Sequence, residues 1–247
     1  MGRFENKSVV ITGGSTGIGF ATAQSLISEG ARILITGRTQ SSLDEAASRL
    51  GGDAIAVLSD AGSLRDIETL AERAKSAFGT VDGLFVNAGV NGFAPFGETT
   101  EELFDELMNI NAKGPYFTVQ RLAPLLSEGS GVVITTSIAN VLGLPTLSAY
   151  AAAKAATRSM VRSLARELLP GGVRVNAVSP GAIDSGILQK SMPDHIAKQA
   201  QAQMAADNPM GRLGTADEVA RAVTYLLFDA SYTTGAELTV DGGGSQL

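Results

Sequence analysis

The chain has 247 residues, of which 44% are hydrophobic and 18% charged, and it contains no cysteine, no tryptophan and a single histidine, His195. The missing cysteines exclude disulfides, thiolate nucleophiles, cysteine-ligated zinc and iron–sulfur clusters, and one histidine cannot form a multi-histidine metal site, so we expect no metal. With 19 basic against 25 acidic residues the net charge is −6, which argues against nucleic acid and anionic membrane surfaces as partners.

Short apolar runs alternate with longer helical patterns along the chain. The runs are continuously apolar, as in parallel sheets covered by helices on both faces. This predicts one α/β domain over residues 1–247, a Rossmann-type doubly wound sheet of seven parallel strands. In chain order we expect a strand at 8–12, a helix at 17–28, a strand at 32–36, a helix at 43–50, a strand at 54–58, a helix at 64–78, a strand at 83–87, a helix at 101–126, a strand at 131–136, a helix at 150–169, a strand at 173–178, a helix at 216–228 and a strand at 236–240.

Residues 184–213 depart from this alternation and contain three methionines and two prolines. Long irregular segments in compact domains are usually lids or binding loops. We therefore expect 184–213 to form a loop with short helices that covers the substrate. His195 lies in this segment, where it either touches substrate or, as we expect, is an exposed loop histidine.

No apolar run approaches the ~20 residues that a membrane helix needs. The first residues lead directly into a strand and lack the apolar core of a signal peptide. We therefore expect a soluble cytoplasmic protein.

The turn after the first strand is rich in glycine. It reads Thr12-Gly13-Gly14-Ser15-Thr16-Gly17-Ile18-Gly19. Glycines there allow a tight turn and let a phosphate approach the amides of a helix N-terminus. The spacing Gly-x-x-x-Gly-x-Gly differs from the usual Gly-x-Gly-x-x-Gly. Glycines at such a turn can be purely structural, but the place after the first strand of an alternating chain favours a nucleotide site.

Tyr150 and Lys154 form a second chemical feature, because residues four apart share one face of a helix. A cation ~4 Å from a phenol, at an effective dielectric of ~20, contributes ~4 kcal/mol, or at most ~3 pK units. Such a shift would bring the phenol toward a pH where it exchanges protons. The alternative is a tyrosine beside a solvated lysine, but the other three tyrosines lack a lysine four residues later.

Ser137 closes the fifth predicted strand, thirteen positions before Tyr150. Ligands of open α/β sheets bind in the crevice at the carboxyl ends of the strands. The Ser137 hydroxyl could therefore hold a substrate oxygen, whereas its structural role would be that of a strand-end cap.

These residues occur in the order and approximate spacing of a known family, and the chain resembles the classical short-chain dehydrogenases/reductases over essentially its whole length. The matching positions are 12–19, Asn87-Ala88-Gly89, Asn111, Ser137, Tyr150 with Lys154, Pro180-Gly181, and 235–243 with Val240-Asp241-Gly242-Gly243. In combination these motifs are far more specific than any one of them.

The resemblance implies an oxidoreductase acting on CH–OH and C=O groups, with hydride carried by a nicotinamide cofactor. By similarity, Tyr150 is the general acid in reduction and the base in oxidation. Lys154 would lower the pKa of Tyr150 and bind the nicotinamide ribose, and Ser137 would orient the substrate oxygen. Asn111 would support a water-linked proton relay, although an asparagine in a helix can equally be a satisfied core residue.

The resemblance also implies a set of cofactor-binding residues. They are Gly13, Ser15, Thr16, Gly17, Ile18 and Gly19 at the pyrophosphate, Gly37, Arg38 and Thr39 at the adenine ribose, Asp60 and Ala61 at the adenine, Asn87, Ala88 and Gly89 along the cofactor, Tyr150 and Lys154 at the catalytic centre, and Pro180, Gly181, Ile183 and Ser185 toward the carboxamide. Relatives more often have threonine where this chain has Ser185, which keeps the hydroxyl.

The choice of coenzyme depends on the end of the second strand. NAD-dependent members usually place a carboxylate there, which would repel a 2′-phosphate. Here Gly37 has no carboxylate and Arg38 offers a cationic fork, so we expect NADP(H) to be preferred over NAD(H). Against this, Thr16 stands where many NADP-dependent relatives have a second basic residue, and Arg38 could be only a solvated charge.

We expect a carbonyl reductase or alcohol dehydrogenase for a small, largely apolar ketone. The expected pocket consists of Val90, Asn91, Phe93, Ala139, Leu142, Leu147 and Ile187. Positions flanking a site can also be simple core residues.

Two alternatives stay open. One is a 3-oxoacyl-thioester reductase using acyl carrier protein or CoA, since the fatty-acid members of the family share these motifs. The stretches where such members need basic residues for an acidic carrier, 125–130 and 169–172, contain no lysine or arginine. The other is a non-catalytic NADP(H)-binding sensor or scaffold, which would need no tuned acid.

The resemblance finally suggests a homotetramer built by the helices carrying Asn111 and Tyr150 and by the C-terminal strand.

Overall fold

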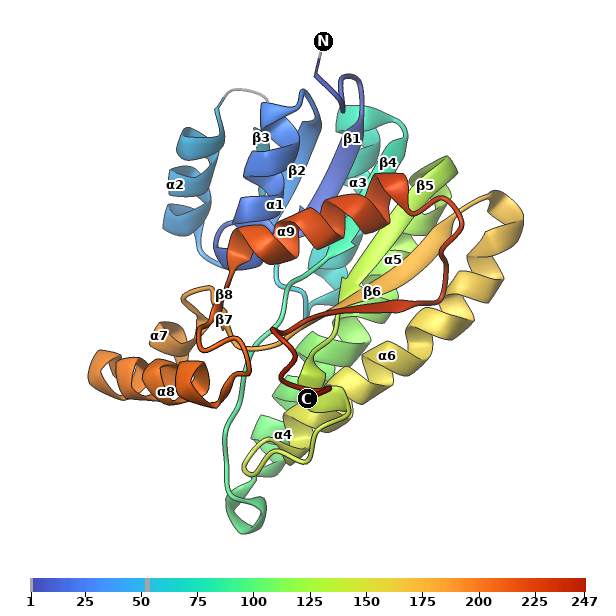
Figure 1. Ribbon diagram of the computed structural model, residues 1–247. Coiled ribbons are helices and arrows are strands. Elements are labelled where there is room, and N and C mark those ends of the chain that lie inside the picture. The colour runs from blue at the N-terminus through green and yellow to red at the C-terminus, as the bar shows by residue number, and fades with distance from the viewer. Residues whose placement is uncertain (1, 52–53) are drawn as a thin grey trace.

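The structure, a computed structural model, describes residues 2–51 and 54–247, and all side chains in these ranges except those of Lys190 and Ser191. Seven parallel strands form one sheet in the order β3-β2-β1-β4-β5-β6-β9 (Figure 1). Their bounds are β1 Ser8–Thr12, β2 Arg32–Gly37, β3 Ala54–Leu58, β4 Val81–Val86, β5 Leu126–Thr135, β6 Arg174–Pro180 and β9 Glu237–Val240. The predicted seven-stranded doubly wound sheet is confirmed, and the strand order reverses between β1 and β4, where such sheets open a crevice for ligands.

Helices cover both faces of the sheet. One face carries α1 (Gly17–Ser28), α2 (Gln40–Leu50) and α9 (Ala216–Thr224), and the other carries α3 (Leu64–Phe78), α5 (Gly114–Leu122) and α6 (Ser148–Leu168).

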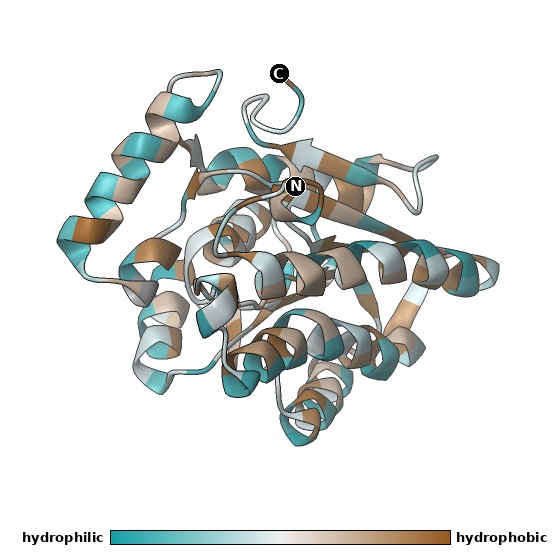
Figure 2. Ribbon diagram, turned by 90° about the horizontal axis from the view of Figure 1, so that it is seen from below, coloured by the Kyte–Doolittle hydropathy of each residue, from teal (hydrophilic) through white to brown (hydrophobic). Residues whose placement is uncertain are grey.

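Successive residues of a strand pack into two separate hydrophobic cores, one on each face of the sheet. Val9 and Ile11 of β1 pack in the same cluster as Leu26 of α1, whereas Val10 packs with Leu70 of α3 on the other face. Because both faces of a strand are buried, its sequence is apolar without alternation. The helices, in contrast, change between hydrophilic and hydrophobic residues along their length (Figure 2).

The predicted helix at 101–126 differs from the structure in two ways. It is divided into α4 (Glu101–Met108), a π-helical turn (Asn109–Lys113) and α5, and its last residues form a 3₁₀ turn (Ala123–Leu125) before β5 begins at Leu126.

Pro115 explains the π turn. Proline has no amide hydrogen and clashes with the carbonyl four residues earlier, here that of Asn111. The wider turn accommodates the ring, and the freed Asn111 carbonyl accepts a hydrogen bond from Thr157 Oγ1 of α6 at 2.6 Å. The break therefore joins the α4–α5 region to α6.

The segment 184–213 is more helical than expected. It contains α7 (Ile187–Ser191) and α8 (Asp194–Asp207), flanked by a small parallel pair, β7 (Ile183–Asp184) and β8 (Gly214–Thr215). α8 was hard to predict because Ala197 is its only buried residue among those described, so the sequence carries little apolar periodicity. Both helices project beyond the carboxyl ends of the strands (Figure 1). Within residues 2–51 and 54–247, no helix is both long and apolar enough to span a bilayer.

Candidate active site

The turn between β1 and α1 is built for close approach of a ligand to the backbone. Gly13 and Gly17 have φ angles of 65° and 55°, in the left-handed region that favours glycine. A Cβ on Gly19 would lie 2.2 Å from the Gly13 carbonyl oxygen, so no other residue fits there. The N-cap residue Thr16 gives the first amides of α1 no side-chain cap. These amides, at the positive end of the helix dipole, fit the pyrophosphate of a dinucleotide.

Threonines that close the strands hold this turn in place. Thr12 Oγ1 accepts hydrogen bonds from the amides of Asn87 (3.0 Å) and Ala88 (3.1 Å). Thr36 Oγ1 accepts one from the Gly13 amide at 3.2 Å, and Thr135 Oγ1 donates to Asn87 Oδ1 at 3.2 Å. Sequence reasoning assigned no role to Thr36 or Thr135. A threonine at the end of an apolar strand was the signal that could have found them.

Ser137, Tyr150 and Lys154 come together where β5 ends and α6 begins. Ser137 is the N-cap of a 3₁₀ turn (Ile138–Asn140), where its Oγ accepts from the Ala139 amide at 3.2 Å, and its hydroxyl lies close enough to Tyr150 to act on the pKa of the phenol. Lys154 is only 4% exposed, and its Nζ donates to the Thr135 carbonyl at 3.0 Å. The same Nζ lies 5.8 Å from the centre of the Tyr150 ring.

Burial dominates the titration of both groups. It raises the pKa of Tyr150 above its usual value, and the nearby Ser137 hydroxyl offsets this only in part. Burial lowers the pKa of Lys154 to about 8. The expectation that Lys154 lowers the pKa of Tyr150 is not met by the protein groups alone: the shift comes from burial, opposed only by the Ser137 hydroxyl, and Lys154 has no part in it.

Asn111 lies in the π turn and is fully buried. Its Oδ1 accepts from the Val90 amide at 3.1 Å, and its Nδ2 donates to the carbonyls of Val90 and Leu107, both at 3.0 Å. Both amide hydrogens are thus engaged within the protein. The side chain ties the loop after β4 to the helical break.

Among the other expected cofactor residues, Gly89 lies against this centre and Ser185 lies against the glycine turn. A Cβ on Gly89 would be 2.8 Å from Asn111 Oδ1 and 3.5 Å from Lys154 Nζ. A Cβ on Gly17 would be 2.9 Å from the Ser185 carbonyl oxygen, which places the start of the 184–213 segment beside the glycine turn.

The adenine end is more open. Gly37 is buried, and a Cβ there would lie 2.9 Å from Ser15 Oγ, whereas Arg38 and Thr39 are exposed. Within the part of the chain that the structure describes, the Arg38 side chain makes no hydrogen bond or ion pair. Asp60 accepts the Gly62 amide at 2.8 Å and so shapes the turn after β3. Ile18 and Ala61 are partly buried at the two neighbouring turns.

The expected substrate residues come from two parts of the chain. The Ala94 amide donates to the Thr146 carbonyl at 3.0 Å, which holds the segment of Asn91 and Phe93 against the loop of Leu142 and Leu147. Ala139 is buried in the turn that follows Ser137, whereas Ile187 begins α7 in the separate 184–213 segment. His195 is exposed, as expected, but it lies on the helix α8 and not in a loop.

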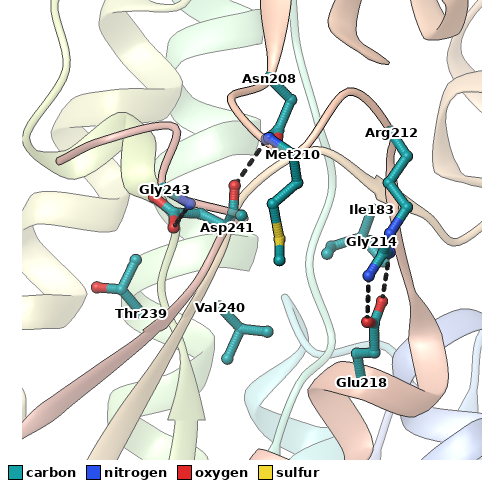
Figure 3. Close-up of a pocket in the computed structure, with 11 residues that line it drawn as sticks. Ile183, Asn208, Met210, Arg212, Gly214, Glu218, Thr239, Val240, Asp241 and Gly243 are labelled. Carbon is teal, nitrogen blue, oxygen red and sulfur yellow. Dashed lines mark hydrogen bonds and ion pairs between the residues drawn. The ribbon is translucent and has the colours of Figure 1, made fainter. Parts of the chain in front are cut away.

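A cavity of about 290 Å³ lies at the other end of the 184–213 segment (Figure 3). Of the expected site residues, only Ile183 lines it. Its walls carry an Arg212–Glu218 ion pair at 2.7 Å and the Asn208 amide bonded to the Asp241 carbonyl at 2.7 Å. These polar groups are satisfied by one another, so they do not converge on a ligand.

The chain matches known proteins over nearly its full length. Residues 13–245 match a family described as enoyl-(acyl carrier protein) reductase. The chain is 38% identical to oxidoreductase asL5 of Sarocladium schorii, covering 99% of this chain and 98% of that protein, and 38% identical to L-rhamnose 1-dehydrogenase (NAD(P)(+)) of Azotobacter vinelandii, covering 96% of each. Levodione reductase of Leifsonia aquatica is 32% identical over 98% of this chain and 96% of that protein. A crystal structure of levodione reductase superposes with a TM-score of 0.92 at 30% identity, covering 98% and 99% of the two chains.

Proposed function

This chain belongs to the classical short-chain dehydrogenase/reductase family and is an NAD(P)-dependent oxidoreductase of CH–OH and C=O groups, and we propose that it is an NADPH-dependent carbonyl reductase or alcohol dehydrogenase for a small, largely apolar ketone or secondary alcohol. The observation that carries the proposal is that the Ser137 hydroxyl lies close enough to the Tyr150 phenol to lower its pKa, beside a buried Lys154 that is fixed by the Thr135 carbonyl. A protein that only binds the coenzyme has no need of such an acid.

Tyr150 serves as the proton donor during reduction. Its raised pKa keeps the phenol protonated at neutral pH, ready to donate to a carbonyl oxygen held by the Ser137 hydroxyl. NADPH, when bound, supplies the hydride. In the reverse direction Tyr150 must be ionised to accept the alcohol proton, so alkaline pH favours oxidation. Lys154, fixed by Thr135, stands where it can bind the ribose, and Asn111 holds the neighbouring loop.

The preference for NADP(H) rests on Arg38. It is exposed at the end of β2, next to a glycine where NAD-dependent relatives carry a carboxylate, and its guanidinium is available to a 2′-phosphate. L-rhamnose 1-dehydrogenase, which carries NAD(P)(+) in its name, shows that relatives of similar identity use either coenzyme.

The substrate is proposed from the residues near Tyr150. Ala139 is buried, and Phe93, Leu142 and Leu147 reach the surface on the two segments that Ala94 joins. They offer apolar surface to a substrate. Residues 184–213, which lie against the glycine turn through Ser185, are proposed as the cover of this site.

The direct test follows NADPH absorbance with a panel of ketones, aldehydes and thioesters, for the wild type and for Tyr150→Phe. Turnover of a ketone that disappears in the variant supports the proposal. A wild type as inert as the variant on every carbonyl compound would favour the sensor or scaffold instead.

A 3-oxoacyl-thioester reductase remains the second candidate because the matching family model is named for an acyl-carrier-protein substrate. The strand start at 126–130 exposes Glu128, and the turn at 169–172 exposes Leu169, with no basic residue in either. An acidic carrier protein would find no complementary charge there. Equal rates with a carrier-bound and a free ketone would overturn our preference.

We also propose a homotetramer. Phe104 of α4 and Tyr116 of α5 are 44% and 41% exposed on the helical region that carries Asn111, and β9 is an edge strand of the sheet. Sedimentation that shows a monomer at micromolar concentration would exclude it.

A further inference from the structure

One acidic side chain near the site has no part in the chemistry above. Glu237, on the edge strand β9, is 15% exposed at its side chain. Its Oε1 accepts hydrogen bonds from Thr136 Oγ1 at 2.5 Å and from Asn140 Nδ2 at 2.8 Å. Its Oε2 lies 3.3 Å from Nε of Arg158, whose side chain is 16% exposed. Burying a carboxylate costs desolvation free energy, which its partners offset only if they are held in good geometry. The three partners of Glu237 are therefore expected to be held in place.

The two partners of Oε1 bracket Ser137. Thr136 immediately precedes it, and Asn140 ends the 3₁₀ turn that Ser137 caps. Within the turn, the Asn140 amide donates to the Ser137 carbonyl at 3.0 Å. A single carboxylate oxygen thus spans the turn and restrains both of its ends.

The partner of Oε2 stands on the helix that carries Tyr150. Tyr150, Lys154 and Arg158 follow one another at intervals of four on α6 and therefore share one face. Arg158 is anchored a second time, because its Nη1 donates to the Gly235 carbonyl at 3.2 Å. Through Arg158, the carboxylate of Glu237 joins the turn of Ser137 to the helix of Tyr150. These are the two elements whose relative position sets the distance between the Ser137 hydroxyl and the Tyr150 phenol.

We propose that Glu237 is a positioning residue for catalysis, which holds Ser137 in hydrogen-bonding distance of Tyr150 by linking Thr136 and Asn140 to Arg158. This inference rests on the proposed function, since it assigns Glu237 a role only through Ser137 and Tyr150. Glu237 itself touches neither the reacting atoms nor the phenol. The competing explanation is that Glu237 only attaches the edge strand β9 to the sheet.

The kinetic test compares three variants. Glu237→Ala removes all the contacts and is expected to lower kcat about tenfold with little change in KM, the effect of a lost charged hydrogen bond. Glu237→Gln keeps an acceptor for Thr136 and Asn140 and is expected to recover most of kcat. Thr136→Val removes the contacts of the Thr136 hydroxyl with Glu237 and with the Val178 carbonyl but keeps the carboxylate. It is expected to show a smaller loss of kcat, which keeps the test valid if Glu237→Ala does not fold.

Asp82→Asn is the matched control. Asp82 bonds Lys7 Nζ and the Ser8 amide, both at 2.9 Å, at the amino ends of β1 and β4, the opposite edge of the sheet from Ser137. Its loss should lower the Tm and leave kcat unchanged. If Glu237→Ala behaves in the same way, Glu237 is only structural and the proposal is wrong.

Two further readouts separate positioning from general destabilisation. In a protein that already carries Ser137→Ala, adding Glu237→Ala should lower kcat by less than about threefold. If Glu237 acts only through Ser137, its loss has little further effect once Ser137 is gone, so the two effects on kcat are not additive. Independent, additive losses would overturn the proposal.

The second readout needs no turnover. Because the nearby Ser137 hydroxyl lowers the pKa of Tyr150, Glu237→Ala should shift the ultraviolet titration of this tyrosine to higher pH, measured as the difference from Tyr150→Phe. An unchanged titration contradicts the role of Glu237. A shifted titration in a protein that reduces no carbonyl compound would support the positioning role and refute the proposed function.

Discussion

The catalytic centre and the coenzyme-selecting end of β2 lie on the same edge of the sheet but are built in opposite ways. Ser137, Tyr150 and Lys154 are held by β5, a 3₁₀ turn and α6, and Lys154 is almost completely buried. Arg38 is exposed, and no partner holds it within the described chain. The proposed chemistry therefore depends on geometry that many contacts share, whereas the proposed preference for NADP(H) depends on one exposed side chain that can change without disturbing the fold.

The largest effect is expected in the buried region, at Tyr150. Tyr150→Phe keeps the ring and removes the acid, so kcat should fall about 10²- to 10⁴-fold, the usual contribution of a general acid. Coenzyme affinity and Tm should change little. Steady-state kinetics with a separate coenzyme titration checks both, and a kcat within tenfold of wild type would show that another group supplies the proton.

The burial of Lys154 should be visible as a pH dependence of stability. Its pKa is about 8 in the folded state, against an ordinary value of 10.5 for a solvated lysine, so between these values the unfolded chain binds more protons and the folded state gains stability as the pH rises. Relative to Lys154→Met, the free energy of unfolding of the wild type should increase by about 3 kcal/mol across this window. Urea unfolding at several pH values measures the difference. Parallel curves would mean that Lys154 is better solvated than its position implies.

At the exposed end, Arg38→Ala should lower the preference for NADPH over NADH about ten- to a hundredfold, the value of one charged hydrogen bond. Tm and kcat with saturating coenzyme should stay the same, because the Arg38 side chain is exposed and holds no other part of the described chain in place. Arg166→Ala, an exposed arginine in the last turn of α6, is the control. Retention of the NADPH preference in Arg38→Ala would place the selection elsewhere.

The smallest effect is expected at Thr39. It is exposed and stands at the N-cap of α2 without a side-chain cap bond, so Thr39→Ala should leave the stability unchanged. If its hydroxyl reaches the ribose or its phosphate, NADPH affinity should fall about two- to tenfold, as for a neutral hydrogen bond. Fluorescence titration of NADPH measures this, and a larger loss would mean that coenzyme selection is shared more widely than one arginine.

The sequence was sufficient for the layered fold because buried parallel strands leave continuous apolar runs and their helices leave a periodic pattern. It was insufficient where a local event interrupts that pattern. Pro115 produces the π turn within a stretch that reads as one helix, and α8 lacks a buried face because only Ala197 is covered among its described residues.

For the candidate site, short-range spacing placed Tyr150 and Lys154 on one helix face and Ser137 at the end of its strand. Short-range spacing could not predict contacts between segments that are far apart in the sequence. Glu237 lies about a hundred positions from Thr136 and Asn140, and the spacing of its own strand gives no indication of either partner. Likewise, the pKa of Tyr150 depends on its burial and on the nearby Ser137 hydroxyl, which the spacing of Tyr150 and Lys154 does not specify.

The π turn at Asn109–Lys113 has a consequence for insertions and deletions in this chain. Each residue advances an α-helix by about 100°, so removing one residue from the turn would rotate everything that follows until the next break. Val119 and Leu122 of α5 would then leave the core, and Asn111 would lose its register with Thr157. Substitutions that keep the length of this turn should be accepted more readily than any change in its length, so the residue count between Glu101 and Leu122 is itself a constraint on how the enzyme can vary.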